Sequence, residues 1–391
     1  MFMDQVGTTT RNLNQMIVVL AVVVTNWSLT ERIVHRYMPF WRCKGDSMRA
    51  TAIVLCLLIL LAPFGGCLGF GMDSEESEPE DLRINHIQVL GTHNSYHLKP
   101  FGPTIRAYDY SHETLDIQAG QFGVRQFELD VWWDVRGQLY VYHNQYDSRT
   151  TCATFEECLN VLLTWSNNNQ NHVPLFIWVE PKEWLRSSTD SNALVELQDM
   201  LGKIELEINQ YWPTEKTITP DQVRGDYETL REAITTSGWP LLEDSRGKAM
   251  FILLADDEMR DAYLTTYPGL NGSLMFTMNE EASDTASFYS DTDPIGMGSE
   301  ITRLVQEGYI VRSRADNAED GEADNNETTR RDAAFAVGAH SISTDYPSKV
   351  DGIDYWVEVP NGPVACNPIS APPGCTSERV ESLNSEIISL Q

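Results

Sequence analysis

The sequence predicts an α/β protein built on a (β/α)8 barrel of the TIM type. Eight short strand-like runs recur within a span of about 260 residues, which is the usual size of such a barrel. The runs 173–179 and 249–254 are almost continuously apolar, as parallel strands buried on both faces are. Segments with apolar residues at helical spacing separate several runs, and no repeat of solenoid period occurs.

The candidate strands follow one another from residue 86 to residue 344. The second and third lie close together, so we expect one helix to be missing or replaced by a loop. Helical spacing is clear in 192–201, and again in 229–234, where Ser237-Gly238-Trp239-Pro240 forms a stop signal. The strand candidates are His86–Gly91, Gly123–Val131, Leu139–Tyr142, Val173–Glu180, Lys248–Leu254, Ser273–Thr277, Tyr309–Ser313 and Ala339–Thr344.

Targeting and linker sequence is predicted to precede the barrel. Residues 50–72 are nearly free of charge, follow a short basic stretch and resemble a secretory signal. Phe64-Gly65-Gly66-Cys67 resembles a lipobox, which would place a lipid on Cys67. An uncleaved membrane anchor is the alternative, since about 20 apolar residues span a bilayer. Both interpretations place the barrel outside the cytoplasm, either secreted or membrane-anchored. The predicted divisions are 1–72 for the extension with signal peptide or anchor, 73–83 for an acidic linker, 84–350 for the barrel and 351–391 for an irregular C-terminal tail.

The composition limits the partners. The chain has 57 acidic against 28 basic side chains, a net charge of −29, and such a surface repels the phosphates of nucleic acid. No protein partner is indicated. Cys152/Cys158 and Cys366/Cys375 form close pairs, and an oxidising compartment would permit disulfides, with four free thiols as the alternative. Neither pair has the spacing of a structural zinc site.

Oxygen-bearing side chains gather at the predicted C-terminal ends of the strands, where the chemistry of such barrels is found. Side chains two apart on a strand point the same way, so Glu128 and Asp130 face one side together. Buried carboxylates are unfavourable unless they bind something. With Asn94 and Glu180 they offer four oxygen-bearing side chains, the ligand type that calcium prefers.

Ionisable side chains at other strand ends complete the pattern. His93 and His143 could accept and donate protons near neutral pH. Arg312 and Arg314 are candidates for binding a phosphate, because the guanidinium group matches phosphate oxygens, or for pairing with the many acids. Asp345 could orient a histidine or bind a hydroxyl group.

An acidic segment, residues 316–327, partly matches an EF-hand calcium loop. Ala318 occupies a ligand position of that pattern, and a strand candidate rather than a helix precedes the segment. We therefore interpret it as a solvated acidic loop.

The motifs that carry these residues resemble the calcium-dependent phosphoinositide-specific phospholipase C family over residues 84–350. They are GTHNSYH (91–97), RQFELDVWWD (125–134), VYHN (141–144), FIWVEPK (176–182) and STDYP (343–347). The eukaryotic X-to-Y split and the PH, EF-hand and C2 modules are not visible, so the chain is similar to the compact microbial type.

The resemblance implies a reaction and a partner. The inositol 2-hydroxyl would attack phosphorus, which releases diacylglycerol and a cyclic inositol phosphate from a phospholipid at a membrane surface. Ca²⁺ would be the cofactor, and Lys182 would contact the substrate. The implied catalytic residues are His93 and His143, with His143 as the favoured general acid, and the implied calcium ligands are Asn94, Glu128, Asp130 and Glu180.

Two alternatives remain open. A glycerophosphodiester phosphodiesterase uses a similar barrel and acidic metal site, but its first strand usually ends in His-Arg-Gly, where this chain has His93-Asn94-Ser95. The second alternative is a catalytically inactive barrel that binds a lipid or a glycan. The presence of both His93 and His143 argues against it.

Overall fold

A computed structural model describes residues 81–134, 136–182, 193–255, 257–318, 320–360 and 362–381. The predicted signal or anchor segment with Cys67 and most of the acidic linker lie outside these residues. Among the helices of the described ranges, none has both the length and the apolar character needed to cross a membrane.

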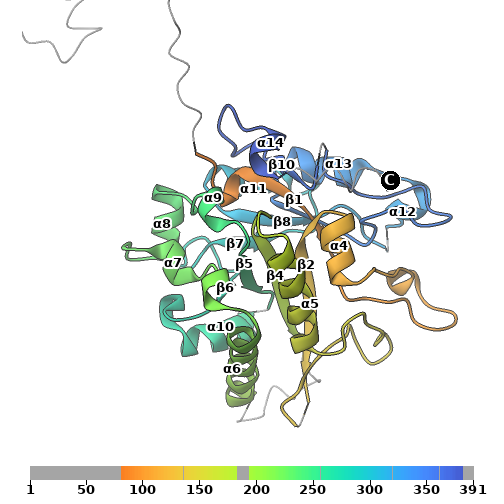
Figure 1. Cartoon of the computed structure of the whole chain (residues 1–391), viewed down its shortest axis with the longest axis horizontal. Helices are drawn as coiled ribbons and strands as arrows, with labels where there is room; N and C mark the ends of the chain where they lie inside the picture. Colours follow the sequence, from red (N-terminus) through yellow and green to blue (C-terminus); the bar gives the residue numbers. More distant parts are fainter. Residues whose placement is uncertain are drawn as a thin grey trace, which may run out of the picture. The chain divides into compact units, whose positions relative to one another are not determined.

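Parallel strands form a nearly closed barrel, which confirms the predicted fold class (Figure 1). β1 (Ile87–Thr92) pairs with β2 (Val124–Trp133) on one side and with β9 (Ser341–Thr344) on the other. The order around the wall is β6-β5-β4-β2-β1-β9-β8-β7, and an isolated parallel bridge between Met278 and Phe288 links the two ends. The remaining wall strands are β4 (Leu175–Lys182), β5 (Ala249–Leu253), β6 (Met275–Thr277), β7 (Phe288–Ser290) and β8 (Ile310–Arg314).

The third predicted strand exists, but it is not part of the barrel wall. β3 (Leu139–Val141) pairs antiparallel with the end of β2, with Val131 opposite Val141. The two strands form a hairpin, so no helix lies between them, as their short spacing predicted. The wall strand that sequence analysis missed is β7, which is only three residues long and therefore gives no apolar run.

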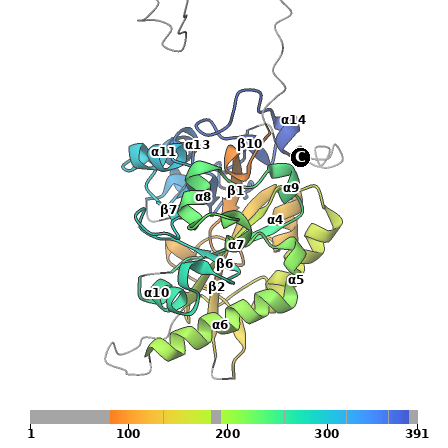
Figure 2. The same ribbon diagram turned by 90° about the vertical axis from the view of Figure 1, so that its left-hand side faces the viewer.

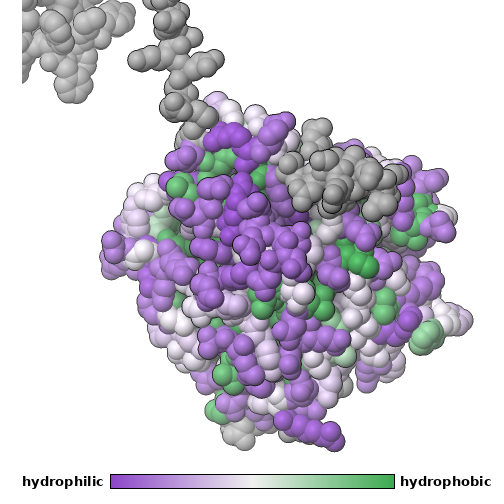
Figure 3. All heavy atoms as spheres, in the orientation of Figure 1, coloured by the Kyte–Doolittle hydropathy of each residue, from purple (hydrophilic) through white to green (hydrophobic). Residues whose placement is uncertain are grey.

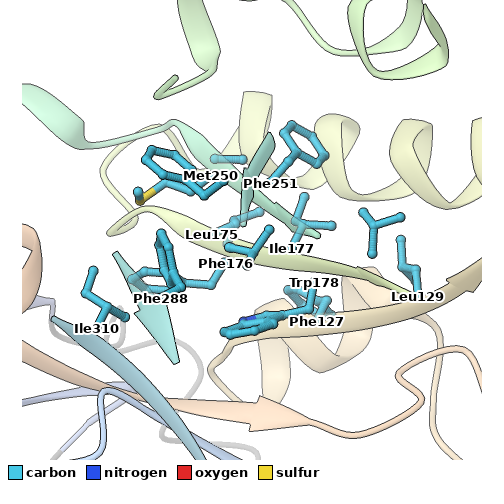
Figure 4. Close-up of a cluster of buried hydrophobic side chains, with 14 of the residues drawn as sticks. Phe127, Leu129, Leu175, Phe176, Ile177, Trp178, Met250, Phe251, Phe288 and Ile310 are labelled. Atoms are coloured by element: carbon cyan, nitrogen blue, oxygen red, sulfur yellow. The ribbon is translucent and has the colours of Figure 1, made fainter. Parts of the chain in front are cut away.

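Phe288 explains how so short a strand is held in the wall. Its ring lies 5.9 Å from that of Trp178, 5.2 Å from that of Phe276, 5.3 Å from that of Trp239 and 6.5 Å from that of Phe176, each measured between centroids. Figure 4 shows Phe288 beside Phe176, with Trp178 close by in the same cluster. Burial of these rings, rather than strand length, fixes β7.

Helices cover the outside of the barrel, and α5 (Phe155–Asn168), α6 (Ala193–Tyr211) and α10 (Asp257–Thr266) lie side by side (Figures 1 and 2). α5 begins at Thr154, whose hydroxyl accepts a hydrogen bond from Glu157 N at 3.2 Å. Residues 193–201 of the first predicted helical segment lie in α6, and the second segment, 229–234, forms the N-cap and first turns of α8 (Leu230–Thr236). The other α-helices are α4 (Leu115–Gln121), α7 (Pro220–Arg224), α9 (Leu242–Ser245), α11 (Gly298–Gln306), α12 (Glu322–Asn325), α13 (Thr329–Ala336) and α14 (Ser377–Val380).

The C-terminal tail is more regular than predicted. β10 (Val364–Cys366) pairs antiparallel with β1, with Ile87 opposite Cys366. A disulfide joins Cys366 to Cys375, and a second one joins Cys152 to Cys158, so both predicted cysteine pairs are bonded. The tail is thereby attached to the first strand of the barrel.

The face shown in Figure 3 is mostly hydrophilic, in keeping with the acidic composition. Three of the large apolar side chains exposed in the described residues belong to two loops that follow β1 and β3. They are Phe101, Ile105 and Tyr146, with exposed fractions of 86%, 60% and 80%. Both loops begin at the C-terminal end of a strand, where the predicted site residues also lie.

Candidate active site

The end of β1 presents His93 and Asn94 in a turn with fixed backbone contacts. Asn94 has a φ of +44°, in the left-handed region that asparagine tolerates better than most residues. On one side of it, His93 N donates to Thr344 O at 3.1 Å, and on the other, Ser95 N donates to Glu128 O at 3.0 Å. The turn is therefore attached to both neighbouring strands, β9 and β2.

His93 is backed by a carboxylate and an arginine. Its Nδ1 lies 2.8 Å from Asp345 Oδ1, and Arg314 Nη2 donates to Asp345 Oδ2 at 3.1 Å. Burial would raise the pKa of Asp345, but the charges of Arg314 and His93 hold it well below its usual value. Burial, followed by the charge of Arg314, lowers the pKa of His93. An ionised carboxylate only accepts, so the neutral imidazole carries its proton on Nδ1 and leaves the Nε2 lone pair free.

His143 follows β3 and is backed by a different carboxylate. Its Nδ1 lies 3.0 Å from Asp147 Oδ2, and His97 Nε2 lies 2.9 Å from both oxygens of the same carboxylate. Asp147 is fully buried, and burial alone would raise its pKa. The hydrogen bonds from His143 and His97 outweigh burial, so the pKa of Asp147 lies below its usual value.

Three acids lie together on β2 and β4. Glu128, Asp130 and Glu180 each place one carboxylate oxygen within 4.8 Å of the others, and Asp130 is opposite Glu180 in the strand register. Asp130 is fully buried, and neither of its oxygens accepts a hydrogen bond of normal geometry from the described residues. Lys182 Nζ lies 3.0 Å from Asp130 Oδ2 and also pairs with Glu180.

The electrostatics of this acidic cluster suit a divalent cation. Burial, and then the negative charge of Glu180, raises the pKa of Asp130 well above its usual value. Burial lowers the pKa of Lys182, but Asp130 and Glu180 outweigh it and the net shift is upward. Asp130 is buried without a hydrogen bond of normal geometry and lies next to two more carboxylates. Carboxylate oxygens are the hard ligands that calcium prefers. The residues therefore fit a calcium ion.

Glu128 is held by a buried arginine. Arg312 forms an ion pair with Glu128, and its Nη2 also donates to Ser343 Oγ at 3.2 Å. The two side chains are 4% and 3% exposed. Burial would raise the pKa of Glu128, but Arg312 outweighs it and the pKa lies below its usual value. Of the two roles predicted for Arg312, pairing with an acid is the one observed.

Asn94 reaches the acidic cluster through tyrosines. Tyr96 donates its hydroxyl to Asn94 Oδ1 at 3.4 Å, and Asn94 Nδ2 donates to the Tyr110 oxygen at 3.2 Å. The pKa of Tyr96 lies well above its usual value because of burial and then because of the charge of Asp130. Asn94, Tyr96 and Asp130 are thus neighbours in one buried group.

A family model described as calcium-dependent phosphoinositide phospholipase C matches residues 82–145 and 139–368. The chain belongs to this family. It is therefore a phospholipase C-like phosphodiesterase, and the match includes every residue of the site described above.

The chain is similar to solved structures of bacterial phospholipases C. The calcium-dependent phosphatidylinositol-specific phospholipase C of Streptomyces antibioticus is 17% identical, with a TM-score of 0.50 over 68% of this chain and 95% of that one. The calcium-dependent enzyme of a Pseudomonas species is 16% identical, with a TM-score of 0.49 over 68% of this chain and 91% of that one. At 17% identity, the likeness to the Streptomyces structure supports the barrel alone. A search of curated proteins found no match.

The predicted site residues of the phospholipase fall into three groups at the strand ends. Asp345 and Arg314 lie with His93, while Lys182 lies among the three acids. His143 and Asp147 lie together on the loop that follows β3, and Asp147 was not predicted from the sequence. The sequence feature that could have indicated Asp147 is its position four residues after His143. The backbone bridge between Asn144 and Asp147 turns the chain so that the carboxylate meets the imidazole ring. The roles of all these residues remain predictions.

The acidic segment 316–327 of the phospholipase does not form a calcium loop among the residues described. Glu322 pairs with Arg330, and Asp324 pairs with Arg106. Asp316 is buried and accepts a hydrogen bond from Thr344. These carboxylates have different partners, and Asp316 and Glu322 are buried, so the segment is less solvated than predicted.

Proposed function

We propose that the enzyme cleaves phosphatidylinositol-type phospholipids to diacylglycerol and a cyclic inositol phosphate, with Ca²⁺ as its cofactor. One observation carries the proposal. His93 and His143, each hydrogen-bonded to an aspartate through Nδ1, lie at the same end of the barrel as the acidic cluster. Asp130 in that cluster accepts no hydrogen bond of normal geometry from the described residues. This arrangement offers a base, an acid and a cation site for one phosphodiester.

The histidines divide the proton transfers. His93 Nε2 takes the proton of the inositol 2-hydroxyl as that oxygen bonds to phosphorus, and Asp345 stabilises the imidazolium that forms. The bond from phosphorus to the glycerol oxygen then breaks, and its electron pair stays on that oxygen. His143, supported by Asp147, supplies the proton that the leaving alkoxide needs.

The cation and phosphate contacts complete the proposed site. When bound, calcium lowers the pKa of the attacking hydroxyl and offsets negative charge on the phosphate. Arg314 and Lys182 would bind the substrate, and both are already held at the site by ion pairs. The residues that would hold calcium are Asn94, Glu128, Asp130 and Glu180.

We also propose that the enzyme works outside the cytoplasm, at a membrane surface. The apolar segment 50–72 with Cys67 supports export, by secretion, by lipidation or by an anchor. Two disulfides suit an oxidising compartment. Exposed Phe101, Ile105 and Tyr146 on loops beside the site would contact lipid.

The test is an assay on phosphatidylinositol vesicles and on glycerophosphodiesters, with calcium and then with a chelator. We expect cleavage of phosphatidylinositol only with calcium, and a cyclic inositol phosphate as the first product. His93→Ala should lower the rate by roughly 100-fold or more. The control is His172→Gln, at a buried histidine that precedes the N-terminal end of β4, and it should keep its activity.

Each other outcome has a distinct meaning. Cleavage that survives the chelator would contradict the calcium assignment. Preference for glycerophosphodiesters would indicate a glycerophosphodiester phosphodiesterase, and no cleavage of either would indicate a binding module. Full activity of His93→Ala would contradict the proposed mechanism.

A further inference from the structure

Asp147 connects two histidines, and only one of them faces the site. His143 is half-buried at the barrel mouth, whereas His97 is fully buried behind Asp147. His97 Nε2 lies at the same distance, 2.9 Å, from both carboxylate oxygens, and His143 Nδ1 takes one of them at 3.0 Å. The three side chains form a continuous row from the interior to the site.

The surroundings of His97 determine the position of its ring and the nitrogen that carries its proton. Its backbone N donates to Asn94 O at 2.8 Å, its O accepts from His112 N at 2.9 Å, and its ring packs on Tyr110 with centroids 4.2 Å apart. Nδ1 is buried and has no hydrogen-bond partner among the described residues. The proton of a neutral His97 therefore lies on Nε2, the atom that faces Asp147.

We infer that His97 is a positioning residue that acts on catalysis through Asp147 and His143. By donating Nε2–H to Asp147, it keeps that carboxylate ionised and turned toward His143 Nδ1. His143 is then held with Nε2 as its only atom free to give a proton. When the bond from phosphorus to the glycerol oxygen breaks, the proton on Nε2 passes to that oxygen and the imidazole becomes neutral. The inference rests on the proposed function.

The alternative is a purely structural role. His97 and Asp147 lie on the two loops that follow β1 and β3, and these loops are also joined by a bridge between His97 and Thr150. A structural link would affect every reaction of the enzyme equally. Support for the leaving group affects only substrates whose leaving oxygen needs a proton, so the two roles can be separated by the choice of substrate.

The experiment compares two esters of inositol phosphate in the full chain with calcium. Phosphatidylinositol releases an alkoxide, which must be protonated, whereas the 4-nitrophenyl ester releases a stable phenolate. The variants are His97→Gln, whose amide nitrogen reaches the position of Nε2, and His97→Asn, whose shorter amide cannot reach Asp147. His143→Ala and Asp147→Asn serve as references.

We expect His97→Asn to lower kcat on phosphatidylinositol by about 10-fold or more, and on the nitrophenyl ester by less than about 3-fold. KM should stay nearly constant, and His97→Gln should recover most of the lost rate. Asp147→Asn should show the same selectivity as His97→Asn. His143→Ala should show it most strongly.

Equal losses on both esters in His97→Asn, or no loss on either, would overturn the inference and leave His97 a structural residue. Failure of His97→Gln to recover the rate would also contradict it, since the donor would then be irrelevant. If wild type cleaves neither ester, or if His143→Ala loses the same activity on both esters, the proposed function itself is contradicted. The inference, which rests on it, is then contradicted as well.

Discussion

Arg312 shows how a charged site is kept inside an apolar barrel. Its guanidinium pairs with Glu128, contacts Ser343 and lies over the ring of Trp178, with 5.6 Å from the guanidinium carbon to the ring centroid. A buried ion pair contributes little net stability, but removing one partner leaves an uncompensated charge in the interior. Glu128 is thus both a proposed calcium ligand and a residue that needs Arg312.

Arg312→Met should destabilise the enzyme by about 3–5 kcal/mol in a calcium-free buffer. The matched control is Arg303→Met, because Arg303 pairs with Glu281, Glu300 and Glu307 at the surface. Exposed ion pairs contribute about 1 kcal/mol or less, so the control should lose little despite its three partners. Urea unfolding measures both values, and equal losses would contradict the burial argument.

At the same scale, the sequence predicts which residues carry charge but not how they pair. The alternation of Glu128 and Asp130 follows from the period of a strand, and the structure places both carboxylates together. The partner of Glu128 is 184 residues away, so the pair depends on the closure of the barrel. Asp147 is near in sequence to His143, but its contact with His97 depends on how two loops meet.

At the scale of elements, length limited the prediction of strands. Long apolar runs such as β4 and β5 were identified, because burial on both faces leaves a continuous pattern. β7 has three residues and is fixed by the packing of Phe288, which no local pattern shows. β3 has a strand pattern, but its short distance from β2 makes it the second arm of a hairpin.

The loops after β1 and β3 act as one rim beside the site. Leu98 bridges to Ser111, His97 bridges to Thr150, and the guanidinium carbon of Arg149 lies 3.9 Å from the centroid of the Phe101 ring. The bridge between His97 and Thr150 joins the two loops, and the contact with Arg149 holds the exposed ring of Phe101. Exposed apolar side chains gain free energy on entering a lipid surface, about 1.5–3 kcal/mol for each one fully buried.

Replacing Phe101, Ile105 and Tyr146 by serine should weaken binding to phosphatidylcholine vesicles that contain phosphatidylinositol by roughly 10-fold or more. Cosedimentation measures this binding, and cleavage of the soluble nitrophenyl ester should change far less. The control is Leu206→Ser, because Leu206 is 54% exposed on α6, outside the rim. An equal loss of binding in the control would show that the rim has no special role.

At the scale of the whole molecule, the sequence predicts the barrel because seven of its eight wall strands, with helices between several of them, leave a pattern over a long segment. The sign of the surface charge also followed directly from composition. The predicted signal or anchor lies outside the described residues and stays a prediction. Buried histidines, in contrast, could not be recognised from sequence, since burial depends on the completed fold.

Three of those histidines should make folding stability depend on pH. Burial lowers the pKa of His112, His172 and His340 to about 4 in the folded chain, from about 6.5 when unfolded. Between these values the unfolded chain binds more protons, so stability is present above pH 6.5 and is lost as the pH falls toward 4. Each histidine contributes about 3 kcal/mol to this loss, since one pKa unit corresponds to about 1.4 kcal/mol.

Asp316 opposes this trend, as does Asp130, whose pKa burial also raises. Burial, and then the charge of Asp345, raises the pKa of Asp316 to about 6. The folded state therefore binds its proton first, and stability is gained as the pH falls through 6, which offsets about one histidine. Urea unfolding at pH 7, 5.5 and 4.5 should show a net loss of several kcal/mol toward acid, and His172→Gln should make the dependence shallower. A stability that rises toward pH 4.5 would mean that the buried histidines bind protons in the folded enzyme.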